Sequence, residues 1–187
     1  MSGEEIRSYL EALASFPRGE PPKGFKYRNI YDYLMQHGAV MESRPATKEQ
    51  RQFIRAVVKS REPKQCFYNA QDAVLGCRAP VGAWEQNRLT YCEGFWHGPR
   101  LPIPIHHGWL MLDVGGENPV LVDPTLRIEP TQPRRWSNFV AGALPEGWAY
   151  FGRAFPGTSV RARWRTGEAG SLLDWPPEWP YLRERGA

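Results

Sequence analysis

The sequence of 187 residues contains only three cysteines, Cys66, Cys77 and Cys92, and no Cys-x-x-Cys pair. An odd number of cysteines without paired spacing argues against a disulfide framework. No apolar run approaches the roughly 18 residues that a membrane-spanning helix needs. The acidic residues 1–5 are unlike a secretion signal. We therefore expect a cytoplasmic protein without a membrane partner, in a reducing compartment where a cysteine thiolate persists.

Charge of one sign is not in large excess, because 24 Lys and Arg residues oppose 20 Asp and Glu residues. A net charge of +4 does not require a nucleic-acid partner. In the basic cluster at residues 161–165, strand alternation would place three arginines on one face. That pattern is typical of a solvated surface, so we do not expect nucleic acid to bind there.

The chain length favours one domain, residues 1–187, which can bury a core without a structural metal. We divide it into a helical part (residues 1–63), a central part (residues 64–126) and a part rich in proline and aromatic residues (residues 127–187). Helices are predicted at residues 2–16, 27–36, 47–60 and 66–77 from apolar side chains at helical spacing. Thr47 and Gln50 are spaced as a capping box.

The pattern changes after the fourth helix, and β-like stretches follow at residues 88–96, 105–114 and 120–123. Turns separate these stretches, which predicts an antiparallel meander. Pro124 is expected to stop the third strand, and residues 148–153 to form a fourth. The predicted fold class is α+β, with N-terminal helices and with the helix that begins at Cys66 packed on the antiparallel sheet.

Three side chains in this arrangement carry chemistry. Cys66 lies in the first turn of a helix, where free N–H groups and the helix dipole favour a thiolate. His107 lies near the start of one strand, and Asp123 at the end of the neighbouring strand. These two side chains can meet if the register places them on one face. A cysteine, a histidine and an aspartate are the parts of a thiol nucleophile with an oriented base.

Four short motifs follow one another over residues 64–125. They are Cys66 at a helix start, Tyr-x-x-Gly at residues 91–94, His-Gly-Trp at residues 107–109 and Asp-Pro-Thr at residues 123–125. In the order and spacing of these motifs, the chain resembles the transglutaminase-like enzymes of the papain-like cysteine enzyme superfamily. The chain departs from the family at three positions. It has Gly108 where the family usually has alanine, Gln65 where the larger enzymes often have glycine, and Phe67 where tryptophan is common. It is also similar to small uncharacterised phage and bacterial proteins with a Cys-x-x-Asn-Ala helix start.

The resemblance implies a cysteine-dependent amide hydrolase (a protease, peptidase or deamidase) that acts on a peptide or protein through a thioester. Its site would be Cys66 as nucleophile, His107 as base and Asp123 as the group that orients the imidazole. No cofactor or metal is implied. The backbone N–H of Cys66 and the Gln65 amide could hold the oxyanion. Asn69 supports the site or is an ordinary helix residue.

Several alternatives remain open at the level of sequence. Trp109, two residues after His107, shields the base or simply belongs to the core. His106 competes with His107, but alternation allows only one of them to face Cys66, and the following Gly-Trp favours His107. His97 is expected to be exposed in a turn. A zinc site of Cys66, Cys92, His97 and His106 lacks finger-like spacing.

Two other functions compete with hydrolysis. An acyltransferase or transglutaminase would use the same triad with an amine as acceptor. A binding protein without activity would use the basic and aromatic residues 127–187 to hold a protein or nucleic acid. The intact triad argues against the second of these.

Overall fold

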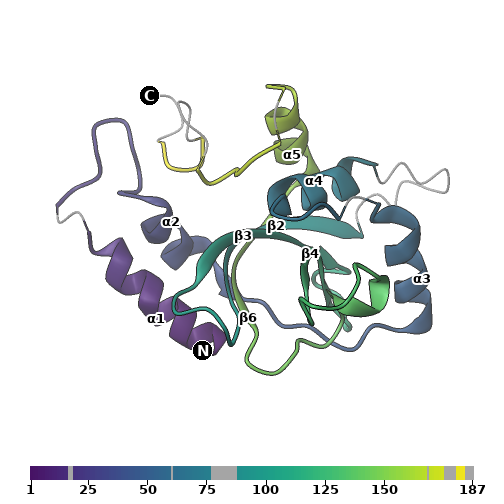
Figure 1. The fold of residues 1–187 in the computed structure, drawn as a ribbon. Coiled ribbons are helices and arrows are strands. Elements are labelled where there is room, and N and C mark those ends of the chain that lie inside the picture. The colour runs from purple at the N-terminus through teal and green to yellow at the C-terminus, as the bar shows by residue number, and fades with distance from the viewer. Residues whose placement is uncertain (17–18, 60, 77–87, 168, 175–179, 184–187) are drawn as a thin grey trace.

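The computed structural model describes residues 1–16, 19–59, 61–76, 88–167, 169–174 and 180–183 (Figure 1). The fold is α+β, as the sequence predicts. Its helices are α1 (Gly3–Ala14), α2 (Ile30–His37), α3 (Lys48–Val57), α4 (Cys66–Gly76) and α5 (Gly157–Trp164). Its strands are β1 (Ala39–Val40), β2 (Leu89–His97), β3 (Ile105–Leu112), β4 (Val120–Arg127), β5 (Phe139–Ala141) and β6 (Ala149–Phe155).

The six strands form one antiparallel sheet in the order β1-β6-β2-β3-β4-β5. The predicted meander of β2, β3 and β4 is confirmed. The predicted fourth strand, β6, lies on the other side of β2 and so becomes an inner strand of the sheet. Figure 1 shows that the sheet is strongly curved, with α4 against its outer side.

Both faces of the sheet are buried, which explains why β2 is buried along nearly its whole length. The helix-side core joins residues of α1, α2, α4 and α5 to one face of the strands, including Ile6, Leu34 and Leu110. The inner core fills the concave face with large side chains, including Trp109 and Tyr150. Neighbouring residues of one strand therefore enter two different cores, because side chains alternate between faces.

The ends of the first and third helices confirm two sequence signals. Ser2 and Glu5 cap α1 reciprocally, and Thr47 and Gln50 form the predicted capping box of α3. Both arrangements satisfy N–H groups that have no partner within the helix. Helix α3 ends at Val57, three residues earlier than predicted.

Two predictions about chain segments are wrong. Strand β4 does not stop at Pro124 but continues to Arg127. The proline lies in an irregular stretch between the paired residues Asp123 and Arg127, where the missing N–H leaves no gap in the ladder. The arginines at residues 161–165 do not form a strand either, because Gly157–Trp164 is helical.

Two other predictions concern residues at the edge of the described chain. Helical spacing places Cys77 on the apolar side of the fourth predicted helix, which predicts a core thiol, but this residue lies outside the described residues. The leucines and aromatic residues within 172–182 predict an arm that packs on the protein, because such side chains are costly to expose, and Leu172, Leu173 and Leu182 are indeed buried. Residues 175–179 of that arm also lie outside the described part.

Two glycines face one another where β2 meets β6, and they bring the two backbones into close approach. A Cβ on Gly94 would lie 2.3 Å from the Phe151 carbonyl oxygen and 2.4 Å from the Gly152 Cα. Gly94→Ala should lower the free energy of unfolding by about 1–3 kcal/mol, since it overpacks a backbone contact. Urea unfolding tests this, with Gly76→Ala as the control because nothing lies within 4 Å of a Cβ there. Equal stability of the two variants would contradict the prediction.

No helix in the described part of the chain is both long and apolar enough to cross a membrane.

Candidate active site

The start of α4 is tied to the loop before it and to β4 by the buried Asn69. Its side-chain oxygen accepts from the Glu62 N–H at 2.9 Å, and its amide nitrogen donates to the Glu62 carbonyl at 2.7 Å. The same nitrogen donates to Thr125 Oγ1 at 2.8 Å. Asn69 therefore fixes the position and direction of the helix start that carries Cys66. It holds the site without lining the pocket.

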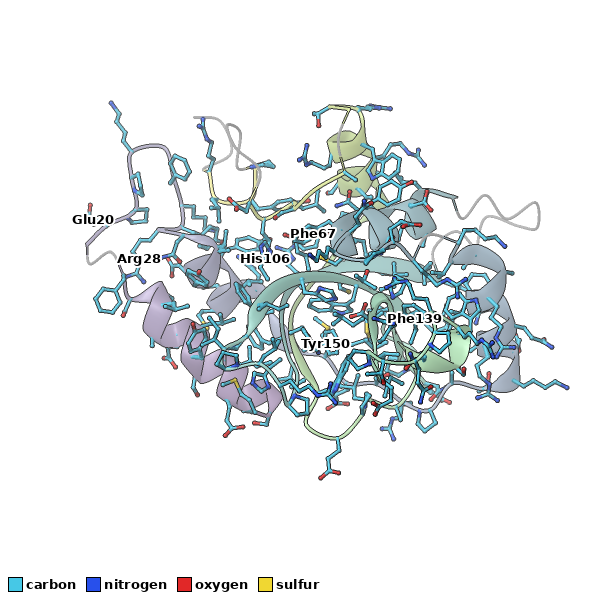
Figure 2. The ribbon with its side chains drawn as sticks, in the orientation of Figure 1. Glu20, Arg28, Phe67, His106, Phe139 and Tyr150 are labelled. Carbon is cyan, nitrogen blue, oxygen red and sulfur yellow. The ribbon has the colours of Figure 1, made fainter. Side chains whose placement is uncertain are left out.

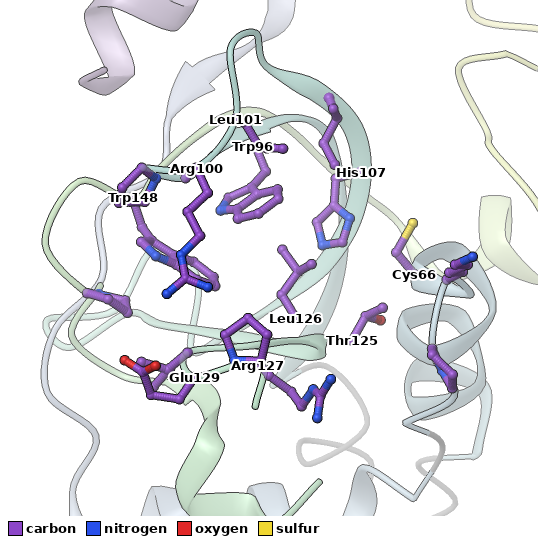
Figure 3. Close-up of a pocket in the computed structure, with 18 of the residues that line it drawn as sticks. Cys66, Trp96, Arg100, Leu101, His107, Thr125, Leu126, Arg127, Glu129 and Trp148 are labelled. Atoms are coloured by element: carbon purple, nitrogen blue, oxygen red, sulfur yellow. The ribbon is translucent and has the colours of Figure 1, made fainter. Parts of the chain in front are cut away.

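His107 connects Asp123 to the thiol of Cys66. Its Nε2 lies 2.7 Å from Asp123 Oδ2, and both residues are buried. Cys66 lies beside the same ring and contributes to raising the pKa of His107. Because Nε2 is directed at the carboxylate, Nδ1 is the ring nitrogen left for the thiol. The expected meeting of the two strand residues is confirmed, and Figure 3 shows Cys66 and His107 next to one another.

Asp123 is held by four donors, so the carboxylate cannot rotate freely. Its Oδ1 accepts from the backbone N–H groups of Thr125 at 2.9 Å and Leu126 at 3.1 Å. Its Oδ2 accepts from the Tyr150 hydroxyl at 2.8 Å and faces His107. Burial alone would raise the pKa of Asp123, but the His107 charge and these hydrogen bonds lower it below the ordinary value.

The same balance favours the imidazolium form of His107. Burial alone would lower the pKa of His107, but the charge and hydrogen bond of Asp123, together with Cys66, outweigh it. They raise the pKa of His107 to about 10. A protonated imidazole between a carboxylate and a thiol is the arrangement that stabilises a thiolate.

Aromatic rings enclose the imidazole on the concave face of the sheet. The Trp109 ring lies nearly parallel to the His107 ring, at a centroid distance of 6.4 Å and an angle of 13°. Trp96 and Tyr150 lie at 5.9 Å and 6.4 Å from it. Trp109 is fully buried and belongs to the inner core, the second of the two sequence alternatives, and its ring also covers one side of the His107 ring.

A pocket of about 670 Å³ opens beside Cys66 and His107. Trp96, Trp148, Leu101 and Leu126 form much of its apolar lining, and several charged side chains complete it. A cavity of this size, lined by apolar and charged side chains, is typical of a site for a small molecule or one side chain of a larger substrate. The described part of the chain thus places the thiol–imidazole pair at the wall of a substrate-sized cavity.

His106 faces the other side of β3, as strand alternation predicts. Its Nε2 lies 2.8 Å from Glu93 Oε1, and its ring packs between Phe67 and Phe95. Figure 2 shows His106 and Phe67 outside the curve of the sheet and Tyr150 within it. Two adjacent histidines therefore form carboxylate pairs on opposite faces of one strand.

Glu93 is completely buried and was not identified from the sequence. It accepts hydrogen bonds from Tyr91, His106, Ser171 and the backbone N–H groups of Leu172 and Leu173. Burial would raise the pKa of Glu93, but His106 and these other donors lower it. The sequence did contain a signal for Glu93: it is an acidic residue on the same strand face as the apolar Leu89, Tyr91 and Phe95.

Other predicted site residues lie elsewhere. Gln65 is exposed and lines a separate shallow hollow with Phe67 and Tyr68, so its side chain is not in the pocket beside Cys66. Its backbone carbonyl accepts from the Asn69 N–H. The expectation that His97 is exposed is wrong, because it is buried at the end of β2 with Nε2 2.9 Å from the Leu101 carbonyl.

The residues of the zinc alternative are separated. Cys92 is buried in the inner core, where burial raises the pKa of its thiol well above the ordinary value, while His106 pairs with Glu93 on the opposite face. Among the residues that the structure describes, no three His, Cys, Asp or Glu side chains form a group that could hold a metal ion.

Comparison of the chain with protein-family models, with curated proteins and with solved structures found no match. The functional argument consequently depends on the chemistry of the site itself.

Proposed function

We propose that this chain is a cysteine-dependent amide hydrolase of papain-like, transglutaminase-like organisation, with Cys66, His107 and Asp123 as its triad. The observation that supports this most strongly is His107, buried between the Asp123 carboxylate and the Cys66 thiol at the wall of a pocket. A structural histidine–aspartate pair would not need a thiol at the start of a helix on its other side.

The proposed reaction has two steps. The Cys66 sulfur attacks the amide carbonyl carbon, the C–N bond breaks, and the imidazolium of His107 gives its proton to the leaving amine. Water then attacks the resulting thioester, His107 takes a proton from that water, and the acid and free thiol are released. Asp123 holds the imidazole in position and stabilises its charge in both steps.

The developing oxyanion lies near the start of α4 in this proposal. The N–H of Cys66 has no partner within the helix, because the first turn leaves such groups free. It is therefore the donor we assign to the oxyanion. The Gln65 side chain would have to turn from its hollow to contribute.

Alkylation of Cys66 by iodoacetamide tests the proposal, with the modified residue identified by mass spectrometry. The rate should reach its plateau well below about pH 8.5, where an ordinary thiol ionises. His107→Ala should abolish that plateau, and Cys66→Ala should abolish labelling at this position. Asp72→Asn, on α4 outside the triad, is the matched control. An ordinary thiol profile in the wild type would sink the proposal.

Acceptor choice is tested separately with a peptide library in the presence and absence of a primary amine. Hydrolysis predicts free acid or released ammonia in both conditions. Formation of an amine adduct at the expense of acid would instead indicate acyl transfer.

A further inference from the structure

The pocket beside Cys66 carries more positive than negative charge. Four cationic side chains and two carboxylates line it: Lys64, Arg100, Arg127, Arg134, Glu129 and Glu146. None of these four cations forms an ion pair with a carboxylate of any described residue. The lining therefore keeps a net positive charge, because four cations accompany two carboxylates.

Two of the arginines use backbone carbonyls instead of carboxylates as partners. Arg127 donates to the Gln132 carbonyl at 2.7 Å, and Arg134 donates to the Arg61 carbonyl. Burial lowers the pKa of Arg134, the nearby charge of Arg127 lowers it further, the Glu62 carboxylate opposes this, and Arg61 adds a smaller lowering. Like charges are thus crowded at this wall, and an anion placed between them would relieve the repulsion.

Lys64 provides an independent sign that this charge has a use. Its backbone φ is +61°, in the left-handed region that residues other than glycine seldom adopt. It lies two residues before Cys66, lines the pocket and is exposed. Backbone strain of this kind is concentrated at functional sites, and glycine or asparagine would occupy the position with less strain.

The pocket also has an aromatic wall. Trp96 and Trp148 lie 4.9 Å apart between ring centroids. Figure 3 shows Arg100 and Trp148 on one side of the pocket and Cys66 and His107 on the other. A cavity of about 670 Å³ lies in the range that holds a small-molecule ligand or one side chain of a larger substrate.

We infer that the pocket selects acyl substrates that carry an anionic group, a carboxylate or a phosphate, next to an apolar or aromatic portion. This inference rests on the proposed acyl-enzyme chemistry at Cys66. The guanidinium groups recognise the anion through paired N–H donors, which match both carboxylate and phosphate oxygens. The indoles of Trp96 and Trp148 hold the apolar portion.

Three bromoacetamides that differ only in the charge of a benzyl substituent test the inference. N-(4-carboxybenzyl)bromoacetamide and its phosphonate analogue are anionic, and the 4-carbamoyl compound is the neutral match. In each reaction the Cys66 thiolate forms an S–C bond as bromide leaves. At low salt, an anionic reagent should modify Cys66 about tenfold faster than the neutral one. The ratio of the two anionic rates separates carboxylate from phosphate preference.

Variants then assign the preference to the wall. Lys64→Asn removes the charge and suits the left-handed backbone, and Arg100→Gln changes an exposed side chain, so both should fold. Each should reduce the preference for the anionic reagent by about threefold, as should Arg127→Gln. Arg7→Gln, an exposed change on α1, should leave it unaltered.

A binding measurement separates this inference from the proposed function. The unreactive acetamide analogues are titrated into Cys66→Ala by calorimetry, where no chemistry is required. Tighter binding of the anionic analogue, weakened in Arg127→Gln, supports the inference even if Cys66 proves unreactive. Equal rates for charged and neutral reagents, together with equal binding, would overturn it while leaving a triad-dependent iodoacetamide profile intact.

Discussion

Replacement of Asp123 by asparagine is expected to lower the free energy of unfolding by about 3–5 kcal/mol near neutral pH. The four groups around the carboxylate are all donors or a charged imidazole, so an amide NH₂ would face donors and leave His107 without its counter-charge. The thiol reactivity of Cys66 should fall as well. Urea unfolding and the iodoacetamide rate measure the two effects.

The pH dependence of the free energy of unfolding is a second measurement that tests the Asp123→Asn prediction. Because the pKa of His107 is raised to about 10, its contribution to wild-type stability is fully present below its unfolded value of about 6.5. That contribution is lost as pH rises through about 10. Asp123→Asn removes the main cause of the raised pKa of His107. The decline of the free energy of unfolding with rising pH should therefore be less steep in this variant.

A matched control exists in Asp113, which is partly exposed and binds Arg88 and Gln50. Asp113→Asn changes the same atoms at a hydrated position and at a φ of +55°, which asparagine tolerates. It should cost about 1 kcal/mol. A loss in Asp123→Asn no greater than this, with the pH slope retained, would show that Asp123 does not hold an imidazolium.

Glu93→Gln should have the second large effect, a loss of about 3 kcal/mol in the free energy of unfolding together with release of residues 169–174, where the C-terminal arm begins. Five donors converge on this buried carboxylate, and three of them come from Ser171, Leu172 and Leu173. Glutamine keeps one acceptor oxygen but directs N–H groups at the remaining donors. Urea unfolding and limited proteolysis within the arm measure the two effects.

Two further variants serve as comparisons for Glu93→Gln: one removes a single donor, and one is a control at an exposed position. Ser171→Ala removes one donor and should cost about 1 kcal/mol without releasing the arm. Glu11→Gln, exposed on α1, should change neither measurement. Protease resistance of the arm in Glu93→Gln equal to that of the wild type would mean that the buried leucines alone hold it.

The encounter of His107 with Asp123 was predictable because it depends on local rules. Strand alternation separates His106 from His107, and a short hairpin brings the middle of β4, with Asp123, close to the first half of β3, with His107. The helix start at Cys66 and the capping box at Thr47 are likewise short-range signals. None of these requires knowledge of distant packing.

Other parts of the site depend on contacts between distant segments. Tyr150 reaches Asp123 from 27 residues away, and Ser171 reaches Glu93 from 78 residues away. No local pattern pairs such residues. Helix α5 was missed because Val160 is its only buried residue, which leaves no apolar stripe to indicate a helix. His97 looked like a turn residue, but the inner core extends to the end of β2.

The two histidines of β3 impose a mechanical constraint on the strand that carries them. A rotation of β3 that moved His107 away from Asp123 would also move His106 against Glu93, which is tied to the C-terminal arm. Rotation of β3 about its own axis is therefore opposed by hydrogen bonds on both of its faces. In the proposed hydrolysis the imidazole would begin each turnover already aligned, so little of the activation barrier would be spent on ordering it. In the proposed enzyme, adaptation to different substrates would fall to the loops around the pocket, because β3 is held by a histidine–carboxylate pair on each face.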